Sequence, residues 1–273
     1  KYQTTTRSSP VKIQNYGECG VSSSTDRIRS DGISSNNEFS WVPFITLDYV
    51  EHISGALISP KHVVAPAELL SYWSDSNRRF LTVRLDRLTV NFAALQKSRL
   101  SYAFVPVRIV LHPQFKMVNK ATKQVVNDVG VITLDRSVTF NEYLRPICLW
   151  TSSDDLSLIA NSQAYAVGFY RDKDGLKWNI KKHTSVKLAD QNTCQRSFLH
   201  LQDVFRHSNA FCFKPVKYGS PCLVFNYVFI KHFGKWYLRG SLSSVNSAKN
   251  CVNDAPYLYE DMAQYSSWLL SQI

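Results

Sequence analysis

Asn127-Asp128-Val129-Gly130-Val131-Ile132-Thr133-Leu134 is the stretch of this sequence that says most about the fold. From Val129 onward its apolar residues fall at both odd and even positions, so both faces of the segment are expected to be buried, as in a strand of a closed barrel. Similar short runs, rich in β-branched and aromatic residues, lie on either side at 41–47, 55–65, 80–85, 105–111 and 165–170. The pattern predicts an all-β barrel or sandwich.

One segment, from Asp261 to Ile273 at the C-terminus, has a convincing helical pattern. Its apolar residues fall near one face at helical spacing: Met262, Tyr265, Trp268, Leu269 and Ile273. We therefore expect a terminal helix that docks an apolar stripe against the rest of the fold.

The composition is that of a folded protein, with 44% hydrophobic and 19% charged residues among 273. This length allows one large β domain or two smaller units. The longest apolar run, 223–230, is far shorter than the roughly 18 residues of a membrane helix, so no membrane span is expected. Residues 1–27 are rich in Ser, Thr, Arg and Gly and resemble an extended tail, which leaves 28–273 as the compact domain.

Cysteine usage bears on the compartment. The six cysteines are Cys19, Cys148, Cys194, Cys212, Cys222 and Cys251. None forms a CxxC motif, so zinc and thioredoxin-type sites have little support, and no metal or other cofactor is expected. An even number favours three disulfides in a secreted, extracellular protein; the alternative is six unpaired core thiols in a cytosolic protein.

The net charge of +11 predicts acidic partners, such as an anionic polysaccharide, a membrane surface or an acidic protein face. Nucleic acid is disfavoured because no helix-turn-helix, zinc-finger or RNA-binding motif accompanies the charge. The candidate anion-binding residues are Arg78, Arg79, Arg84, Arg87, Lys97, Arg99, Lys177, Lys181 and Lys182. The alternative for these clusters is solvated loop charge.

Taken in order, the segments resemble the trypsin-like (chymotrypsin-fold) serine proteases over about residues 19–273. Residues 38–41 are similar to the strand after the family's activation site, 54–59 to a core strand of its first barrel, and 127–134 to the strand that carries its aspartate. The segments 143–149, 167–170 and 236–240 and the terminal helix follow in family order. The resemblance implies two six-stranded antiparallel β-barrels with a C-terminal α-helix, and it is closest to arthropod homologues that assist protease cascades in immunity or development.

The resemblance also implies how the cysteines pair. The implied bridges are Cys19–Cys148, Cys194–Cys212 and Cys222–Cys251. The first would tether residues 1–27, a propeptide-like tail, to the domain. The third joins the nucleophile loop to the pocket entrance in the family, although Cys222 comes several residues late for that role.

The family's mechanism needs a histidine base, an aspartate that orients it, a serine nucleophile and two main-chain N–H groups for the oxyanion. The resemblance places Glu68 at the histidine position and Gly219 at the serine position, and it retains Asp128. The base and the nucleophile are therefore expected to be missing. Ser220 is the alternative nucleophile, but a shift of one residue in a tight turn redirects the side chain.

Activation and substrate selection are expected to be altered as well. Arg27-Ile28 is the candidate cleavage junction, but Tyr218 stands where the family has the aspartate that pairs with the freed amino terminus. The residues expected in an occluded specificity pocket are Phe213, Ser243 and Tyr257, of which Ser243 also resembles the residue that supports the family's aspartate.

These features predict a catalytically inactive extracellular serine protease homologue that acts as a binding, cofactor or regulatory protein, with proteases or their substrates as partners. Two alternatives remain. One is a module that binds anionic, heparin-like polysaccharide through the basic clusters. The other is an unconventional hydrolase that uses Glu68, Asp128 or a relocated histidine, His52 or His62.

Overall fold

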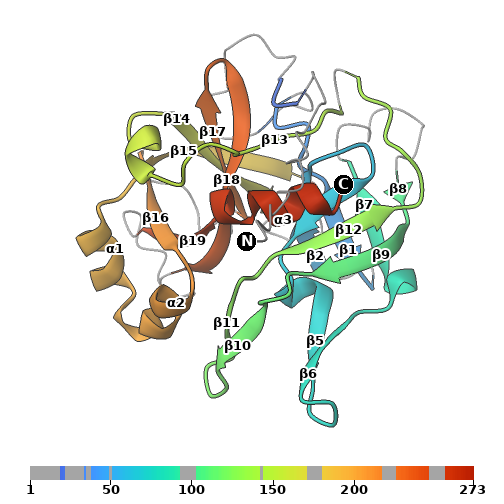
Figure 1. Ribbon diagram of the computed structural model, residues 1–273. Coiled ribbons are helices and arrows are strands. Elements are labelled where there is room, and N and C mark those ends of the chain that lie inside the picture. Colours follow the sequence, from blue (N-terminus) through green and yellow to red (C-terminus); the bar gives the residue numbers. More distant parts are fainter. Residues whose placement is uncertain are drawn as a thin grey trace, which may run out of the picture.

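The computed structural model describes residues 19–21, 34, 38–48, 51–92, 103–141, 144–170, 180–216, 226–245 and 256–273. Within these residues two β-barrels lie next to each other, and the C-terminal helix lies near their junction (Figure 1). The chymotrypsin-like, all-β fold class expected from the sequence is confirmed.

The first barrel consists of β1 (Phe44–Leu47), β2 (Glu51–Ser54), β3 (Ala56–Leu57), β4 (His62–Ala65), β7 (Leu88–Asn91), β8 (Ala103–Phe104), β9 (Pro106–Leu111) and β12 (Gly130–Leu134). Two four-stranded sheets result, in the orders β2-β1-β7-β8 and β3-β4-β12-β9. Only Gly55 separates β2 from β3, and only Val105 separates β8 from β9. These two bent strands run through both sheets, so the eight elements amount to six strands that close a barrel.

Glycine is required at the first of these bends. A Cβ atom on Gly55 would lie 2.6 Å from Cγ1 of Val63 and 3.1 Å from Cδ1 of Ile45, which are core side chains of the same barrel. The strand can therefore turn this corner only where no side chain projects inward. The single run expected over 55–65 is in fact two strands, β3 and β4, joined by a turn.

The second barrel consists of β14 (Gln163–Tyr170), β15 (Ile180–Leu188), β16 (Ala210–Pro215), β17 (Tyr227–His232), β18 (Lys235–Val245) and β19 (Tyr257–Asp261). The strand order is β18-β17-β14-β15-β16-β19, and an additional pairing of β18 with β19 closes the ring. A short strand, β13 (Cys148–Leu149), runs parallel to β18 outside the ring.

Two hairpins project from the first barrel toward the bottom of Figure 1. They are β5 (Ser71–Ser74) with β6 (Arg79–Thr82), and β10 (Lys116–Asn119) with β11 (Gln124–Val126). Both hairpins contribute side chains to one pocket beside Glu68, which is described below.

The α-helices are α1 (Gln191–Ser197), α2 (Gln202–His207) and α3 (Ser266–Ser271), and the 3-10 helices are η1 (Glu68–Leu70), η2 (Leu85–Arg87), η4 (Leu156–Ile159), η5 (Leu199–Leu201) and η6 (Met262–Tyr265). The helix expected over 261–273 is found as η6 followed by α3. Its stripe docks as expected, with Met262 and Leu269 buried.

The structure also has two helices that the sequence pattern did not indicate, because α1 and α2 form a helical excursion between β15 and β16. Both are too short for a periodic apolar pattern, and Cys194 is the one buried residue of α1. The Asp190 carboxylate starts α1 by accepting a hydrogen bond from the main-chain N–H of Thr193 at 2.8 Å.

The N-terminal segment is tied to the second barrel through a disulfide between Cys19 and Cys148, the pairing that the resemblance implies. Next to it, Gly20 has a φ of +66°, and a Cβ there would collide with the main-chain carbonyl of Trp236. The main chain of Gly20 donates to the carbonyl of Pro146 (2.8 Å) and accepts from Trp236 (2.9 Å). The anchor is therefore both covalent and hydrogen-bonded.

We expect that protein cut between Arg27 and Ile28 keeps its N-terminal fragment until it is reduced, because Cys19 lies on that fragment and Cys148 on the other. Electrophoresis of the cut protein with and without reductant tests this expectation. Release of the fragment without reductant would contradict the bridge.

A second disulfide joins Cys194 on α1 to Cys212 on β16, also as the resemblance implies. The third implied pair, Cys222 and Cys251, lies outside the described residues. No described helix is long and apolar enough to cross a membrane.

Candidate active site

Asp128 lies two residues before the start of β12 and is buried, with 8% of its surface exposed. The main-chain N–H of Glu68 donates a hydrogen bond of 2.6 Å to its Oδ1 atom. Burial raises the pKa of Asp128 to about 8, although the main-chain donors of Glu68 and Ala67 act in the opposite direction. The carboxyl group is therefore largely protonated at neutral pH.

Glu68 begins η1, and two residues separate it from the end of β4; its main chain lies beside Asp128. Burial also raises the pKa of its carboxyl group. The main chain of Glu68 therefore lies beside the aspartate, at the position that the sequence resemblance assigns to the family's histidine. Glu68 itself is exposed and lines the pocket described below, and its carboxyl group has no neutral ring nitrogen that could accept a proton from a serine hydroxyl.

A third carboxyl group, that of Glu260 on β19, supports Asp128 from the other barrel. Oε2 of Glu260 accepts hydrogen bonds from the main-chain N–H of Asp128 (3.1 Å) and from the hydroxyl of Tyr265 (2.8 Å). Burial raises the pKa of Glu260, and its negative charge is one of the factors that raise the pKa of Asp128. The main chain of Asp128 and the hydroxyl of Tyr265 therefore hold the Glu260 carboxyl group in place beside the site.

A buried tyrosine on β17 completes the surroundings of Asp128. Tyr227 is fully buried, and its hydroxyl donates to the carbonyl oxygen of Val64 at 3.1 Å. Burial raises the pKa of this phenol well above its ordinary value, and the charge of Asp128 acts in the same direction. Tyr227 therefore remains neutral and fills space between the two barrels.

The structure offers little support for a relocated histidine. Nδ1 of His62 is hydrogen-bonded at 2.7 Å to the hydroxyl of Ser59, which lies three positions earlier in the chain. This ring nitrogen is therefore not bonded to Asp128. The side chain of His52 is outside the described part of the chain. Among the described residues, no group of three or more His, Cys, Asp and Glu side chains could hold a metal ion.

A pocket of about 540 Å³ opens beside Glu68, between the β5–β6 and β10–β11 hairpins. Its lining includes Tyr72, Trp73, Met117 and Lys120. Trp73 is held from two sides, because its Nε1 donates to Asp75 (2.9 Å) and its ring faces the ammonium of Lys120 (5.9 Å). The pocket is therefore a preformed surface with aromatic and charged groups, as binding sites commonly are.

The expected pocket-filling residues lie in one region of the second barrel. Phe213 on β16 is 1% exposed and pairs in register with Tyr257 on β19. Tyr257 is half-buried and packs on the same apolar cluster. Ser243 is half-buried on β18, and the hydrogen bonds that the structure records to the Asp128 carboxylate come from main chain rather than from Ser243.

Several predicted positions lie outside the described residues. They are Arg27, Ile28, Lys97, Arg99, Lys177, Tyr218, Gly219 and Ser220, together with the side chain of Lys182. The nucleophile position and the cleavage junction therefore remain sequence-based predictions.

The expectation that Lys181 contributes to a basic patch on the surface was wrong. Lys181 is buried, with 6% of its surface exposed, and its ammonium donates to the main-chain carbonyl of Phe39 at 3.0 Å. Burial lowers the pKa of Lys181 to about 7, partly offset by the charge of Glu38. A lysine in strand β15 points inward here, so its charge is not available to an external anion.

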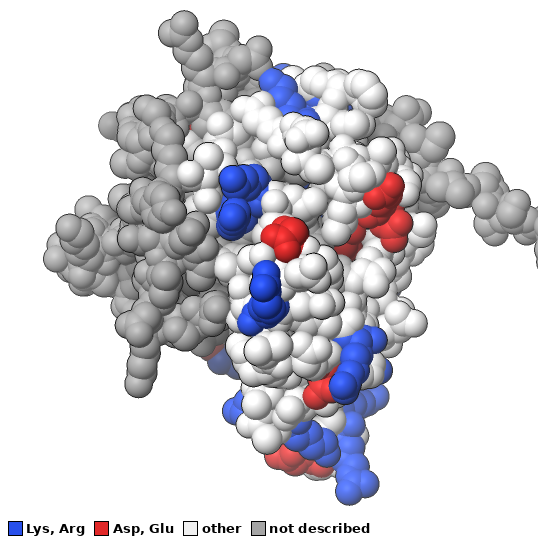
Figure 2. All heavy atoms as spheres, turned by 90° about the vertical axis from the view of Figure 1, so that its left-hand side faces the viewer, with Lys and Arg blue, Asp and Glu red and all other residues white. Residues whose placement is uncertain are grey.

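The other described members of that patch are exposed, but two of them are ion-paired. Arg84 pairs with Asp86 at 2.6 Å, and Arg87 pairs with Asp48. Arg78 and Arg79 lie exposed at the turn of the β5–β6 hairpin. On the face shown in Figure 2, basic and acidic side chains are interspersed instead of forming one basic surface.

Sequence reasoning missed Glu260 and Tyr227, the two groups that neighbour Asp128 from the second barrel. Each lies about 100 or more positions along the chain from Asp128, since Glu260 is separated from it by 132 residues. Two adjacent acidic residues, Glu260 and Asp261, at the end of a strand that begins Tyr-Leu-Tyr are the signal that could have identified the first of them.

Two antiparallel barrels with a buried aspartate near their junction define a protein of the chymotrypsin fold. The family model for trypsin matches residues 32–223, and the chain belongs to the trypsin family. The resemblance expected from the sequence is thereby confirmed, whereas the domain boundary between residues 27 and 28 stays a prediction.

The similar proteins include insect serine proteases. The chain is 23% identical over 271 residues to Serine protease 7 of Drosophila melanogaster, a match that covers 94% of this chain and 67% of that protein. It is 24% identical over 274 residues to CLIP domain-containing serine protease B15 of Anopheles gambiae, covering 94% of this chain and 72% of the relative. With Serine protease gd of Drosophila melanogaster it shares 21% identity over 284 residues, which covers 88% of this chain and 52% of that protein.

Because the pKa of Asp128 is raised, we expect Asp128→Asn to increase the free energy of unfolding, relative to wild type, by more at high pH than at low pH. The folded protein holds a proton on Asp128 up to a pH of about 8, whereas the unfolded chain releases it near 3.8, so this group destabilises the fold increasingly across that interval. We expect the free energy of unfolding of the variant, relative to wild type, to increase by roughly 1 kcal/mol or more between pH 5 and pH 8. Urea unfolding at both pH values measures it; a difference that does not change with pH would contradict the assignment.

Proposed function

We propose that this chain is a non-catalytic member of the trypsin family that acts by binding other proteins, as a cofactor or regulator of extracellular proteases. The observation that carries the proposal is Glu68 beside Asp128, with the glutamate main chain hydrogen-bonded to the aspartate. The sequence resemblance assigns Glu68 to the position of the family's histidine, and among the described residues no histidine ring is hydrogen-bonded to Asp128.

The electrostatics of the site support the same conclusion. An aspartate that orients a catalytic imidazole must be ionised to stabilise the imidazolium that forms during proton transfer. Asp128 has a pKa of about 8 and is surrounded by Glu68 and Glu260, so the un-ionised form is favoured at neutral pH. This environment favours an un-ionised Asp128, whereas the protease reaction needs a negative charge on the aspartate beside the imidazolium.

The pocket beside Glu68 gives the proposed binding role a surface. Tyr72 is 54% exposed at its rim, and Trp73 and Phe80 stack edge to face within it (5.2 Å between centroids). Exposed aromatic side chains over a preformed hollow are typical of protein-binding surfaces. We propose that an extended segment of a protease or of its substrate binds between the two hairpins.

The proposed role in a protease cascade rests on the similar proteins, because the names of some of them describe CLIP domain-containing serine proteases of insects. We propose an extracellular location for this chain, which its two disulfides support. The proposed partners are proteases of immune or developmental cascades and the proteins that these proteases cleave.

An add-back experiment tests the proposal. Extracellular fluid of the source organism is depleted of this protein with an antibody, and cleavage of the endogenous protease zymogens is then followed by immunoblot. We expect depletion to slow cleavage, wild-type protein to restore it, and Tyr72→Ala to restore it about tenfold less well. Leu199→Ala is the matched control, because Leu199 is also an exposed large side chain (68% exposed), on the helical excursion of the second barrel. Unchanged cleavage after depletion would refute the proposal.

A further inference from the structure

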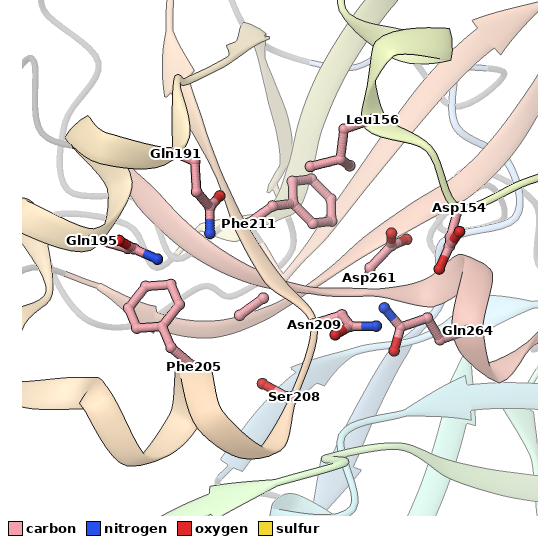
Figure 3. Close-up of a pocket in the computed structure, with 11 residues that line it drawn as sticks. Asp154, Leu156, Gln191, Gln195, Phe205, Ser208, Asn209, Phe211, Asp261 and Gln264 are labelled. Carbon is pink, nitrogen blue, oxygen red and sulfur yellow. The ribbon is translucent and has the colours of Figure 1, made fainter.

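A second pocket, of about 330 Å³, lies on the second barrel between the α1–α2 excursion and η6 (Figure 3). Four separate segments form it: the chain leading into η4, helix α1, the end of α2 with the start of β16, and the β19–η6 junction. Its lining includes Asp261, the residue after Glu260 on β19. Successive strand residues point to opposite sides, so this pocket and the Asp128 site lie on different faces of β19.

Side-chain amides dominate the lining. They belong to Gln191, Gln195, Asn209 and Gln264. All four residues are exposed, and none of the four amide groups has a hydrogen-bond partner among the described residues. Gln191 and Gln195 lie one turn apart on α1 and therefore share a helix face. In Figure 3 the side chains of Gln191 and Gln195 enter from one end of the pocket and those of Asn209 and Gln264 from the other.

Apolar surface lies between these two amide pairs. Phe205 on α2 and Phe211 on β16 line the pocket, together with Leu156. Phe211 is buried at 2% exposure, whereas Phe205 is only partly buried and presents its ring to the pocket. An aromatic face flanked by amides offers both dispersion contact and directed hydrogen bonds.

The charges of the pocket exclude an anionic ligand. Among the lining residues there is no lysine or arginine, and Asp154 and Asp261 are acidic. Asp261 is already engaged, because Oδ2 accepts from Arg239 (2.9 Å) and Oδ1 accepts from the main-chain N–H of Ala263 (3.0 Å). A cationic ligand would use Asp154 alone and leave the amide N–H groups without acceptors. A ligand with hydroxyl groups, which both donate and accept, satisfies amides and carboxylate together.

The lining is held in place before any ligand arrives. The Cys194–Cys212 disulfide joins α1, between Gln191 and Gln195, to the strand residue that follows Phe211. An apolar cluster that includes Phe198, Val204 and Leu258 packs the helical excursion onto the barrel. A rigid arrangement lowers the entropy lost on binding.

We propose that this pocket binds a neutral, hydroxyl-rich ligand, namely a sugar ring of a neutral glycan, with the amides and Asp154 bonding its hydroxyls and Phe205 packing against its apolar face. The pocket volume lies at the lower end of the roughly 300 to 1,000 Å³ typical of small-ligand sites, which suits one or two sugar rings. This function is independent of the proposed role of the Glu68 site.

The test is binding of full-length protein to immobilised neutral oligomers of glucose, mannose, galactose and N-acetylglucosamine, with heparin and an arginine-rich peptide as charged comparators. The best neutral oligosaccharide is then titrated calorimetrically. We expect binding to at least one neutral glycan, with an affinity that changes less than twofold between 0.05 and 0.5 M NaCl, because no ion pair forms.

Variants locate the binding. Gln195→Leu and Gln264→Leu each replace the amide with a shorter apolar side chain that cannot hydrogen-bond, and we expect each to weaken binding about tenfold. Gln202→Ala is the control, because Gln202 is an exposed glutamine of α2 outside the lining. Melting temperatures equal to wild type, together with unchanged activity in the add-back experiment described for Tyr72→Ala, show that the variants are folded. Failure to bind any neutral glycan, binding of only heparin or the basic peptide, or unchanged affinity in both leucine variants would overturn the proposal.

Discussion

Glu68→His combined with Gly219→Ser is expected to give a folded protein that still does not hydrolyse peptides. With Asp128 the two changes complete a nominal catalytic triad. However, the new imidazole would neighbour an aspartate whose pKa is raised by burial, the largest cause, and by the charge of Glu260, and both causes remain in the variant although the contribution of Glu68 is lost. An un-ionised partner cannot stabilise the imidazolium, and loss of that function alone lowers turnover by roughly 10⁴-fold.

The loop around position 219 adds a second barrier. The family uses two main-chain N–H groups to bind the oxyanion, and each is worth about 100- to 1,000-fold in rate. Here the sequence has Lys217 and Tyr218 before Gly219, in place of the family's glycine and aspartate. We expect hydrolysis of fluorogenic peptides by the double variant to stay at background. Stoichiometric labelling of residue 219 by a fluorophosphonate would show instead that the site is preorganised.

Arg239→Met is expected to destabilise the fold by about 3 kcal/mol at neutral pH, because it removes one partner of a buried ion pair. Arg239 is fully buried, and its Nη2 donates to Asp261 (2.9 Å) and to the main-chain carbonyl of Asp154 (2.8 Å). Its guanidinium also lies over the ring of Trp150 at 5.0 Å. Methionine fills a similar volume but leaves the Asp261 carboxylate buried without its cation.

The pH dependence of this loss identifies its cause. Burial raises the pKa of Asp261 to about 6 even with Arg239 present, and loss of the guanidinium raises it further. Below pH 5 the carboxyl group is protonated in the folded variant, so the destabilisation should be smaller there than at pH 8. Arg239→Met with Asp261→Asn should recover most of the stability, because asparagine can still accept from Ala263. Urea unfolding measures all three proteins; an equal loss at pH 5 and pH 8 would contradict the ion-pair account.

The barrels could be predicted because each strand carries its own local pattern. The stretch 127–134 has apolar residues on both faces, and the structure places most of it in β12, between β4 and β9 in the first barrel. Two of the three disulfide pairs that the resemblance implies, Cys19–Cys148 and Cys194–Cys212, are present in the structure, and the third stays a prediction. By contrast, α1 and α2 are too short to show a helical period in their apolar residues. The capping residue Asp190 and the buried Cys194 are a weaker signal than the alternation of a strand.

The site was predicted in part. Glu68 and Asp128 are neighbours as the resemblance implies, but the third carboxyl group, Glu260, comes from a distant strand. Lys181 shows why charge alone misleads. Its position in a basic stretch predicted a solvent-exposed side chain, but the register of its strand turns the side chain inward. Contacts between segments far apart in sequence depend on barrel packing, which local patterns do not encode.

The central claim is that the Glu68 and Asp128 site does not catalyse peptide hydrolysis, and turnover by activated protein tests it most directly. Full-length protein is cut between Arg27 and Ile28, purified with its tail still attached through Cys19, and incubated with a broad panel of fluorogenic peptides at pH 5 to 9. We predict a rate indistinguishable from buffer for every peptide. Turnover that is abolished by Ser220→Ala, or by Glu68→Gln, would contradict the account.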